Sequence, residues 1–316
     1  MDLPINQFKR AIASGRTPLG AWLGSGAPST AEALGCAGFD FLVVDTEHTP
    51  IDTPQMIDIL RAIASGRTPL GAWLGSGAAS TAEALGCVGF DFLVVDMEHT
   101  PIDTPQMIDI LRAIAGTPAQ AIVRPPWNDM VMIKRALDAG AQSLLLPFVQ
   151  NADEARRAVS YTRYPPEGVR GVAGTHRGSR YGTVSNYLKR ASEEICVIVQ
   201  IETLPALAKL DEIAAVPGID SIFIGPSDLS ASMGHLGDIT HSAVQEHLAA
   251  AAKACRRAGK PSGIIGPTPD MVARFLDYGY SWVAIGSDMG FMVGRAQEYL
   301  SRFRTASAAA DKPAAR

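Results

Sequence analysis

The chain has 316 residues, a formal net charge of −4 at pH 7 and 47% hydrophobic residues. This charge gives no basic footprint for nucleic acid, and no apolar run is long enough to span a bilayer. The four cysteines lack CxxC or metal-type spacing, and the N-terminus lacks the pattern of a signal peptide. We therefore expect a cytoplasmic protein with reduced thiols that binds neither nucleic acid nor membrane.

Residues 10–60 recur almost unchanged as residues 61–111. Repeats of solenoid proteins normally diverge and occur three or more times, so we interpret this pair as a recent internal duplication. With one copy removed, the chain would be about 265 residues long, the size of a single (β/α)8 barrel. The copies differ at three pairs of positions, Pro28 and Ala79, Ala37 and Val88, and Thr46 and Met97.

Strands and helices alternate along the whole chain. The first copy has predicted strands at 19–24 and 39–45, each followed by a helix. From the second copy onward, eight apolar or β-branched runs predict strands that begin at 70, 90, 119, 142, 196, 221, 262 and 282. The helices between them are expected to begin near 80 and 151 and to span 103–115, 128–139, 204–214, 241–258, 269–278 and 289–304.

Strict alternation predicts parallel strands joined by right-handed crossovers, and eight such units close a TIM barrel. An open doubly wound sheet is the competing fold, but no Gly-x-Gly-x-x-Gly follows the first strand in either copy. We expect the fold class to be α/β, a (β/α)8 barrel with an extra N-terminal βαβα copy.

A closed eight-stranded barrel cannot accept the two additional strands. Extruding one copy from inside the barrel costs loop-closure entropy, which favours the second copy in the barrel. The first copy in the barrel, or its exchange into a neighbouring subunit, is the alternative. The expected regions are an appendage at 1–60, the barrel at 61–304 and a disordered Ala-rich tail at 305–316.

Polar residues collect at the C-terminal ends of the predicted strands, the rim where barrel enzymes keep their chemistry. Residues two apart on a strand share a face, so Gln200 and Glu202 must point the same way. The other strand-end groups are Asp96, His99, Arg124 and Asp228.

Glu202 and Asp228 form a hard oxygen site that suits Mg²⁺ or Mn²⁺ with water. Arg124 can hold a carboxylate through a forked pair of hydrogen bonds, and His99 is the candidate base. The structural alternatives are solvated strand-end acids, a capping arginine and a histidine that satisfies loop carbonyls. Together the groups predict a 2-oxo acid substrate and an enolate, and the lack of lysine at these strand ends argues against a Schiff base.

Five motifs carry a resemblance that runs in order from about residue 70 to 304. They resemble the HpcH/HpaI aldolase family, the class II pyruvate aldolases, which include 4-hydroxy-2-oxoheptanedioate and 2-dehydro-3-deoxyglucarate aldolases. The motifs are Asp-x-Glu-His-x-Pro (96–101), Val-Arg-Pro-Pro-Trp-Asn-Asp (123–129), Leu-Pro-Phe-Val-Gln-Asn-Ala-Asp-Glu-Ala (146–155), Val-Gln-Ile-Glu (199–202) and Phe-Ile-Gly-Pro-Ser-Asp-Leu-Ser (223–230).

The resemblance implies a carbon–carbon lyase that cleaves, or forms, 4-hydroxy-2-oxo acids, with pyruvate and an aldehyde as the products of cleavage. It implies a divalent metal, Mg²⁺ or Mn²⁺ with Co²⁺ as a further candidate. It also implies a homo-oligomer, a hexamer of dimers that exchange the last helix, residues 289–304.

The family's site residues are carried over by their positions in these motifs. Glu202 and Asp228 match the metal ligands, and Gln200 lies beside them. Arg124 matches the residue on the pyruvate carboxylate and keto oxygen, and Ser227 with Asp228 supplies backbone amides to the carboxylate. The remaining matches are His99 as base, Asp138 as its paired aspartate, and Asp96 near the aldehyde half.

The duplication leaves alternatives open. The first copy repeats the strand-end motif, so Asp45 and His48 could serve instead of Asp96 and His99. A decarboxylase or other lyase, for instance one acting on oxaloacetate, could use the same enolate. A non-catalytic assembly module would result if the duplication disrupts the site. The basic loop 168–182 either reads the charge of the aldehyde or is an ordinary solvated loop.

Overall fold

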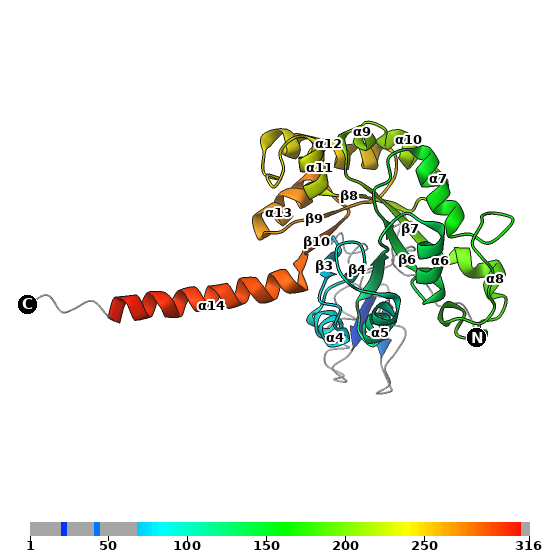
Figure 1. Cartoon of the computed structure of the whole chain (residues 1–316), viewed down its shortest axis with the longest axis horizontal. Helices are drawn as coiled ribbons and strands as arrows, with labels where there is room; N and C mark the ends of the chain where they lie inside the picture. Colours follow the sequence, from blue (N-terminus) through cyan, green and yellow to red (C-terminus); the bar gives the residue numbers. More distant parts are fainter. Residues whose placement is uncertain (1–19, 24–40, 45–67, 311–316) are drawn as a thin grey trace, which may run out of the picture.

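The computed structural model describes residues 20–23, 41–44 and 68–310 of the chain (Figure 1). Eight parallel strands close into a barrel in the order β10-β3-β4-β5-β6-β7-β8-β9. The strands are β3 Leu70–Leu74, β4 Phe92–Asp96, β5 Gln120–Arg124, β6 Ser143–Leu146, β7 Cys196–Ile201, β8 Ser221–Ile224, β9 Ser262–Ile265 and β10 Trp282–Ser287. The predicted (β/α)8 fold is therefore confirmed.

Helices follow the strands and surround the barrel (Figure 1). Side-chain caps explain where several of them begin. Asp103 and Gln106 form a capping box at the start of α5. At the start of α7, the side chain of Asn151 accepts a hydrogen bond from the backbone N–H of Glu154. The helices are α4 Ala79–Val88, α5 Thr104–Ile114, α6 Met130–Asp138, α7 Ala152–Tyr161, α8 Tyr187–Arg190, α9 Leu204–Leu207, α10 Leu210–Ala214, α11 Pro226–Ser232, α12 Ser242–Arg257, α13 Pro269–Tyr278 and α14 Asp288–Ala310.

Three features differ from the predicted elements. The helix expected over 204–214 is divided into α9 and α10, because Lys209 between them has non-helical backbone angles. The short helices α8 and α11 lie where no helix was expected. Helix α14 continues to Ala310, into the segment expected to be disordered, because alanine is the strongest helix former.

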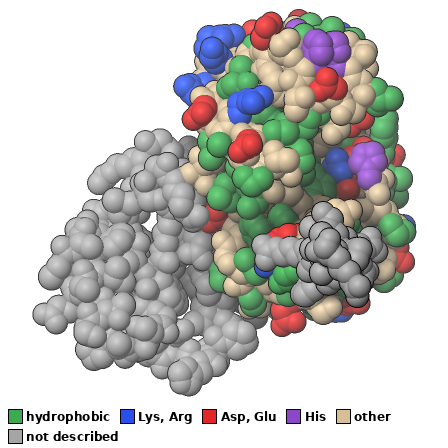
Figure 2. Space-filling view, turned by 90° about the vertical axis from the view of Figure 1, so that its left-hand side faces the viewer, with side chains coloured by type: hydrophobic (Ala, Val, Ile, Leu, Met, Phe, Trp, Pro, Cys, Tyr) green, Lys and Arg blue, Asp and Glu red, His purple; other side chains and the backbone are tan. Residues whose placement is uncertain are grey.

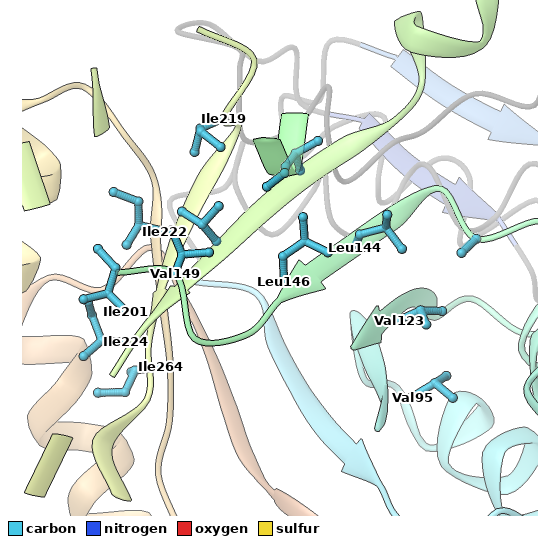
Figure 3. Close-up of a cluster of buried hydrophobic side chains, with 14 of the residues drawn as sticks. Val95, Val123, Leu144, Leu146, Val149, Ile201, Ile219, Ile222, Ile224 and Ile264 are labelled. Carbon is cyan, nitrogen blue, oxygen red and sulfur yellow. The ribbon is translucent and has the colours of Figure 1, made fainter. Parts of the chain in front are cut away.

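Two layers of apolar side chains hold the barrel together. Alternate strand residues face the helices and form the main core, part of which is seen in Figure 3. The others fill the barrel interior, where the ring of Trp282 contacts the rings of Phe92 and Phe223. Gly71 is needed opposite Phe92, since a Cβ there would lie 2.3 Å from the ring. The interior is thus a packed core that closes the barrel below its rim.

The strands of both sequence copies are found, but in different sheets. The second copy provides β3 and β4 of the barrel, whereas β1 Gly20–Leu23 and β2 Phe41–Val44 pair in a two-stranded parallel sheet. Gly20 pairs with Phe41 as Gly71 pairs with Phe92, so the two pairs share one register. The helices expected in the first copy, together with Asp45 and His48, lie outside the described residues.

Crossing a bilayer requires a helix that is both long and apolar, and none within the described ranges meets both conditions.

Candidate active site

The interior face of the barrel ends in polar side chains at its C-terminal rim. On β4, Phe92 and Val94 fill the interior, and Asp96 is the next residue on that face. On β5, Arg124 follows Ile122 in the same way. Strand alternation therefore brings Asp96 and Arg124 together above the packed interior.

Strand β7 delivers its polar residues by the same alternation. Cys196 and Ile198 fill the interior, and Gln200 and then Glu202 follow on that face. The amide Nε2 of Gln200 donates a short hydrogen bond to Oε2 of Glu202. The two side chains point the same way, as the alternation predicts.

Arg124 is held by a fork of hydrogen bonds. Its Nε donates to Oδ1 of Asp96 at 2.9 Å, and its Nη2 donates to Oδ2 at 2.7 Å. The guanidinium also lies over the ring of Trp73, with its carbon 5.2 Å from the ring centre. These contacts fix the plane of the guanidinium at the rim.

Glu98 lies against the remaining side of Arg124. Its Oε2 is 2.9 Å from Nη1 of Arg124, and its side chain is 13% exposed. Although the two atoms are this close, Oε2 is buried and accepts no hydrogen bond from the described residues. The N–H group of Arg124 therefore does not point at Oε2, and the contact is an ion pair without a hydrogen bond. Burial, with smaller contributions from Asp96 and Asp228, raises the pKa of Glu98 to about 7 against the pull of Arg124.

Two hydrogen bonds fix the Glu202 carboxylate. The backbone N–H of Phe148 donates to Oε1 at 2.8 Å, and Gln200 donates to Oε2. Phe148 has a φ of 56°, a left-handed conformation that is costly for an aromatic residue and recurs at functional sites. A Cβ on Gly225 would lie 2.8 Å from Oε2 of Glu202, so glycine leaves the room this carboxylate occupies.

The charges of the carboxylates act on one another. Burial raises the pKa of Glu202 to about 7, the hydrogen bond from Gln200 opposes this rise, and Glu98 and Asp228 add to it. Asp228 and Ser227 are exposed in the first turn of α11, where backbone N–H groups have no partner within the helix. Asp228, Glu98 and Glu202 therefore share one local electrostatic environment.

These groups fit a hard divalent cation. All the charged donors are carboxylate oxygens, and the buried Oε1 of Gln200 lacks a hydrogen-bond partner in the described part of the chain. Within that part, no three His, Cys, Asp or Glu side chains are arranged to surround a metal. The pair Glu202 and Asp228 suits Mg²⁺ and similar ions, which are typically held by one or two carboxylates and keep several waters.

His99 and Asp138 are not brought together within one chain. His99 has a side chain that is 61% exposed, with Nε2 3.7 Å from Glu98. Asp138 instead accepts a 2.7 Å hydrogen bond from Nη2 of Arg170 and lies 3.6 Å from His176. It ends α6, which runs back from the rim, so it lies toward the opposite end of the barrel.

Some residues of the loop 168–182 pack against neighbouring segments, whereas Val169, residues 171–175, Tyr181 and Gly182 are exposed to solvent. Arg170 is fully buried and stacks on Tyr164, with its guanidinium carbon 4.4 Å from the ring centre. His176, whose pKa burial lowers, lies beside Asp138. Arg177 donates to the carbonyl of Ala139 at 3.0 Å. These contacts join the loop to the end of α6.

Three features of the site were not expected from the sequence. Glu98 stands two residues after Asp96, so continued strand alternation would have placed it on the same face and could have identified it. The amide of Phe148 gives no sequence signal, because a phenylalanine does not indicate a positive φ. The small size of Gly225 could have been noticed only with Glu202 already in position.

Comparisons with known proteins show the family of this chain. A model of the HpcH/HpaI aldolase/citrate lyase family matches residues 69–294. The chain is 51% identical over 232 residues to 2-dehydro-3,6-dideoxy-6-sulfogluconate aldolase from Pseudomonas putida, covering 73% of this chain and 91% of that protein. It is 46% identical over 253 residues to 4-hydroxy-2-oxo-heptane-1,7-dioate aldolase from Shigella sonnei, covering 80% and 96%.

A solved structure of a family member from Burkholderia cenocepacia superposes with a TM-score of 0.73 at 38% identity, covering 75% of this chain and 95% of that one. An HpcH/HpaI aldolase from Desulfitobacterium hafniense gives 0.69 at 25% identity, covering 80% and 96%. The aldolase relatives indicate that this chain is a carbon–carbon lyase. The chain belongs to the HpcH/HpaI aldolase/citrate lyase family.

Proposed function

We propose that this chain is a class II aldolase that uses a divalent metal to cleave, or form, 4-hydroxy-2-oxo acids, with pyruvate and an aldehyde as the cleavage products. The observation that carries the proposal is the single rim that holds a clamped Arg124 and the carboxylates Glu202 and Asp228. A cationic fork and an oxygen-only metal site together suit the carboxylate and keto oxygen of a 2-oxo acid.

In this proposal, Glu202 and Asp228 hold Mg²⁺ or Mn²⁺, with Co²⁺ as a further candidate. The ion supplies Lewis-acid polarisation of the keto oxygen. The N–H groups of Arg124 that do not donate to Asp96 would bind substrate oxygens. Gln200 would lie beside the metal, and the backbone amides of Ser227 and Asp228 would donate to the substrate carboxylate.

The acid–base step falls to His99, the exposed imidazole at the rim. It removes the proton of the C4 hydroxyl, the C3–C4 bond breaks to release the aldehyde, and the resulting enolate takes a proton at C3 to give pyruvate. Asp96 lies on the side of the aldehyde half.

We also propose that the active enzyme is a homo-oligomer, a hexamer by resemblance. Helix α14 extends away from the barrel (Figure 1), and Figure 2 views the molecule from that side. Large apolar side chains on α14 are exposed, namely Met289, Phe291, Met292, Val293, Tyr299 and Leu300. Because Asp138 lies far from the rim of its own chain, any pairing with His99 would be made between subunits.

Mixing two inactive variants tests that pairing. Oligomers assembled from His99→Ala and Asp138→Ala chains would regain activity at sites that combine an intact residue from each chain. Light scattering after size-exclusion chromatography gives the size of the assembly. Equally inactive mixed oligomers would contradict a pairing between subunits.

The experiment that tests the activity is a comparison of substrates and metals. The chain should release pyruvate from a 4-hydroxy-2-oxo acid with Mg²⁺ or Mn²⁺, and Glu202→Ala and Asp228→Ala should abolish the release. Activity retained with chelator would contradict the proposal. Faster pyruvate formation from oxaloacetate than from the 4-hydroxy-2-oxo acid would favour a decarboxylase, and metal binding without turnover would favour an assembly module.

A further inference from the structure

We propose that Glu98 is a specificity-determining residue that pairs with Arg124 before the substrate binds and gives way to an oxygen of the 2-oxo acid. This inference rests on the proposed function, since it requires a substrate carboxylate to reach Arg124. Neither the family resemblance nor the strand-end pattern assigns a role to Glu98.

The two acidic partners of Arg124 hold it in different ways. Asp96 makes two aligned hydrogen bonds, to Nε and Nη2, and both side chains are almost fully buried. Glu98 makes one contact with Arg124, at Nη1, and this contact is not a hydrogen bond although the two atoms are 2.9 Å apart. The fork is therefore the permanent support of the guanidinium, and the Glu98 contact is the one that can be exchanged.

The backbone keeps Glu98 close to this position. Its N–H donates to Oδ1 of Asp96 at 3.0 Å, and the N–H of Met97 donates to the carbonyl of Arg124 at 2.9 Å. Only the side chain beyond these anchors is free to rotate. The carboxylate can therefore leave Nη1 without unfolding the loop, and it returns when the site empties.

The charges around Arg124 give the exchange a selective effect. One guanidinium faces the carboxylates of Asp96 and Glu98, and Glu98 also feels the charge of Asp228. An anion that binds Arg124 through a single oxygen gains little binding free energy, because it must displace the carboxylate of Glu98. A 2-oxo acid presents a carboxylate and an adjacent keto oxygen that engage Arg124 and the metal site together, so it can displace Glu98.

The test is the affinity of the Mn²⁺-saturated oligomer for pyruvate, measured by calorimetry. Glu98→Gln and Glu98→Ala should each bind pyruvate about tenfold more tightly than the unmodified chain, because a like charge near the ligand is removed. Acetate should gain more than pyruvate does, so the preference for pyruvate over acetate should fall. Glu246→Gln, an exposed glutamate on α12, is the matched control and should change neither affinity.

Unchanged or weaker pyruvate binding by folded Glu98 variants would overturn the inference, since a merely supporting residue would weaken binding when lost. A crystal structure of the unmodified chain with Mn²⁺ and pyruvate gives a second readout that does not depend on the folding of a variant. A pyruvate oxygen should replace Glu98 at Nη1, and an undisturbed Glu98 contact would contradict the exchange. If the unmodified chain binds no pyruvate with Mg²⁺ or with Mn²⁺, both the proposed function and this role of Glu98 are refuted.

Discussion

Arg124 donates hydrogen bonds from Nε and Nη2 to the two oxygens of Asp96, at 2.9 and 2.7 Å. Strand pairing sets up this fork, because Asp96 on β4 is the registered neighbour of Arg124 on β5. Asp96 thus fixes the orientation of the residue that is expected to bind the substrate. This fixed orientation requires the planar guanidinium group, which can donate two hydrogen bonds to Asp96 and still has N–H groups for the substrate.

Replacing Arg124 by lysine should therefore remove most of the activity. Lysine keeps the charge but cannot make the fork, so we expect kcat/KM for a 4-hydroxy-2-oxo acid to fall by about 100-fold or more. Arg112→Lys is the control, because Arg112 pairs with Asp109 on the exposed face of α5. Activity of Arg124→Lys within about threefold of the control would show that charge alone suffices.

Gly225→Ala should separate activity from stability. The added Cβ would lie 2.8 Å from both Cβ and Oε2 of Glu202 and 3.3 Å from Nε2 of Gln200, so the carboxylate must shift. The backbone of Gly225 is in an ordinary extended region, which alanine adopts without strain. We expect Mn²⁺ affinity and pyruvate release to fall at least about tenfold, while the melting temperature changes by only a few degrees.

Gly75→Ala is the matched control for that substitution. Gly75 follows β3 at the same rim, and a Cβ there would meet Thr100 at 3.5 Å, an ordinary contact. Titration of each variant with Mn²⁺ alongside thermal unfolding makes the comparison. Equal metal affinity in the two variants would show that Glu202 adjusts to the added methyl group.

Much of the fold and the placement of the site residues could be predicted from the sequence because they depend on local periodicity. Alternation along β7 puts Gln200 and Glu202 on one face, and parallel strands bring their C-terminal ends to one rim. These inferences need only which residues share a strand face and which end of the barrel they occupy.

What could not be predicted depends on contacts between segments distant in sequence. The ion pair between Asp138 and Arg170 joins α6 to a long loop, and no periodicity relates the two residues. The positive φ of Phe148 is imposed by its surroundings, since phenylalanine itself disfavours it. Helix α14 ends later than expected, at Ala310, because a run of alanines favours helix although its composition also resembles that of a disordered tail.

Deleting residues 10–60 should leave a folded and active enzyme. The barrel closes through β3 and β4 of the second copy, so the deletion removes no barrel strand. The apolar cores are formed by residues from 72 onward among those whose burial the structure describes. We expect kcat/KM within about threefold of the full chain and a similar melting temperature, since distant, independent segments contribute separately.

The matched deletion is residues 61–111, which leaves the first copy to supply the equivalent strands. The two products differ only at the three substituted positions of the repeat, so comparable activity is expected from both. An active 10–60 deletion beside an inactive full chain would instead show that the additional copy disrupts the site. Loss of folding on removing 10–60 would contradict the proposed division into appendage and barrel.

The metal-free protein should lose stability as pH rises from about 5 to above 7. Glu98 and Glu202 each have a pKa raised from 4.5 to about 7 by burial. The folded protein then binds more protons than the unfolded chain across this interval, so stability falls with increasing pH and levels off once both groups are ionised. A divalent cation at Glu202 and Asp228 favours the ionised form, so its stabilising effect should grow over the same interval.

Urea unfolding between pH 5 and 8, with chelator or with Mn²⁺, measures both effects. Other groups also titrate, so the informative quantity is the difference between the unmodified chain and Glu202→Gln, which has no carboxyl group to ionise. We expect this difference to shift in favour of the variant as pH rises, by up to roughly 3 kcal/mol for a fully shifted group. Mn²⁺ should remove the shift by stabilising the unmodified chain alone. A difference that does not vary with pH in the absence of metal would mean that Glu202 is already ionised in the metal-free protein at pH 5.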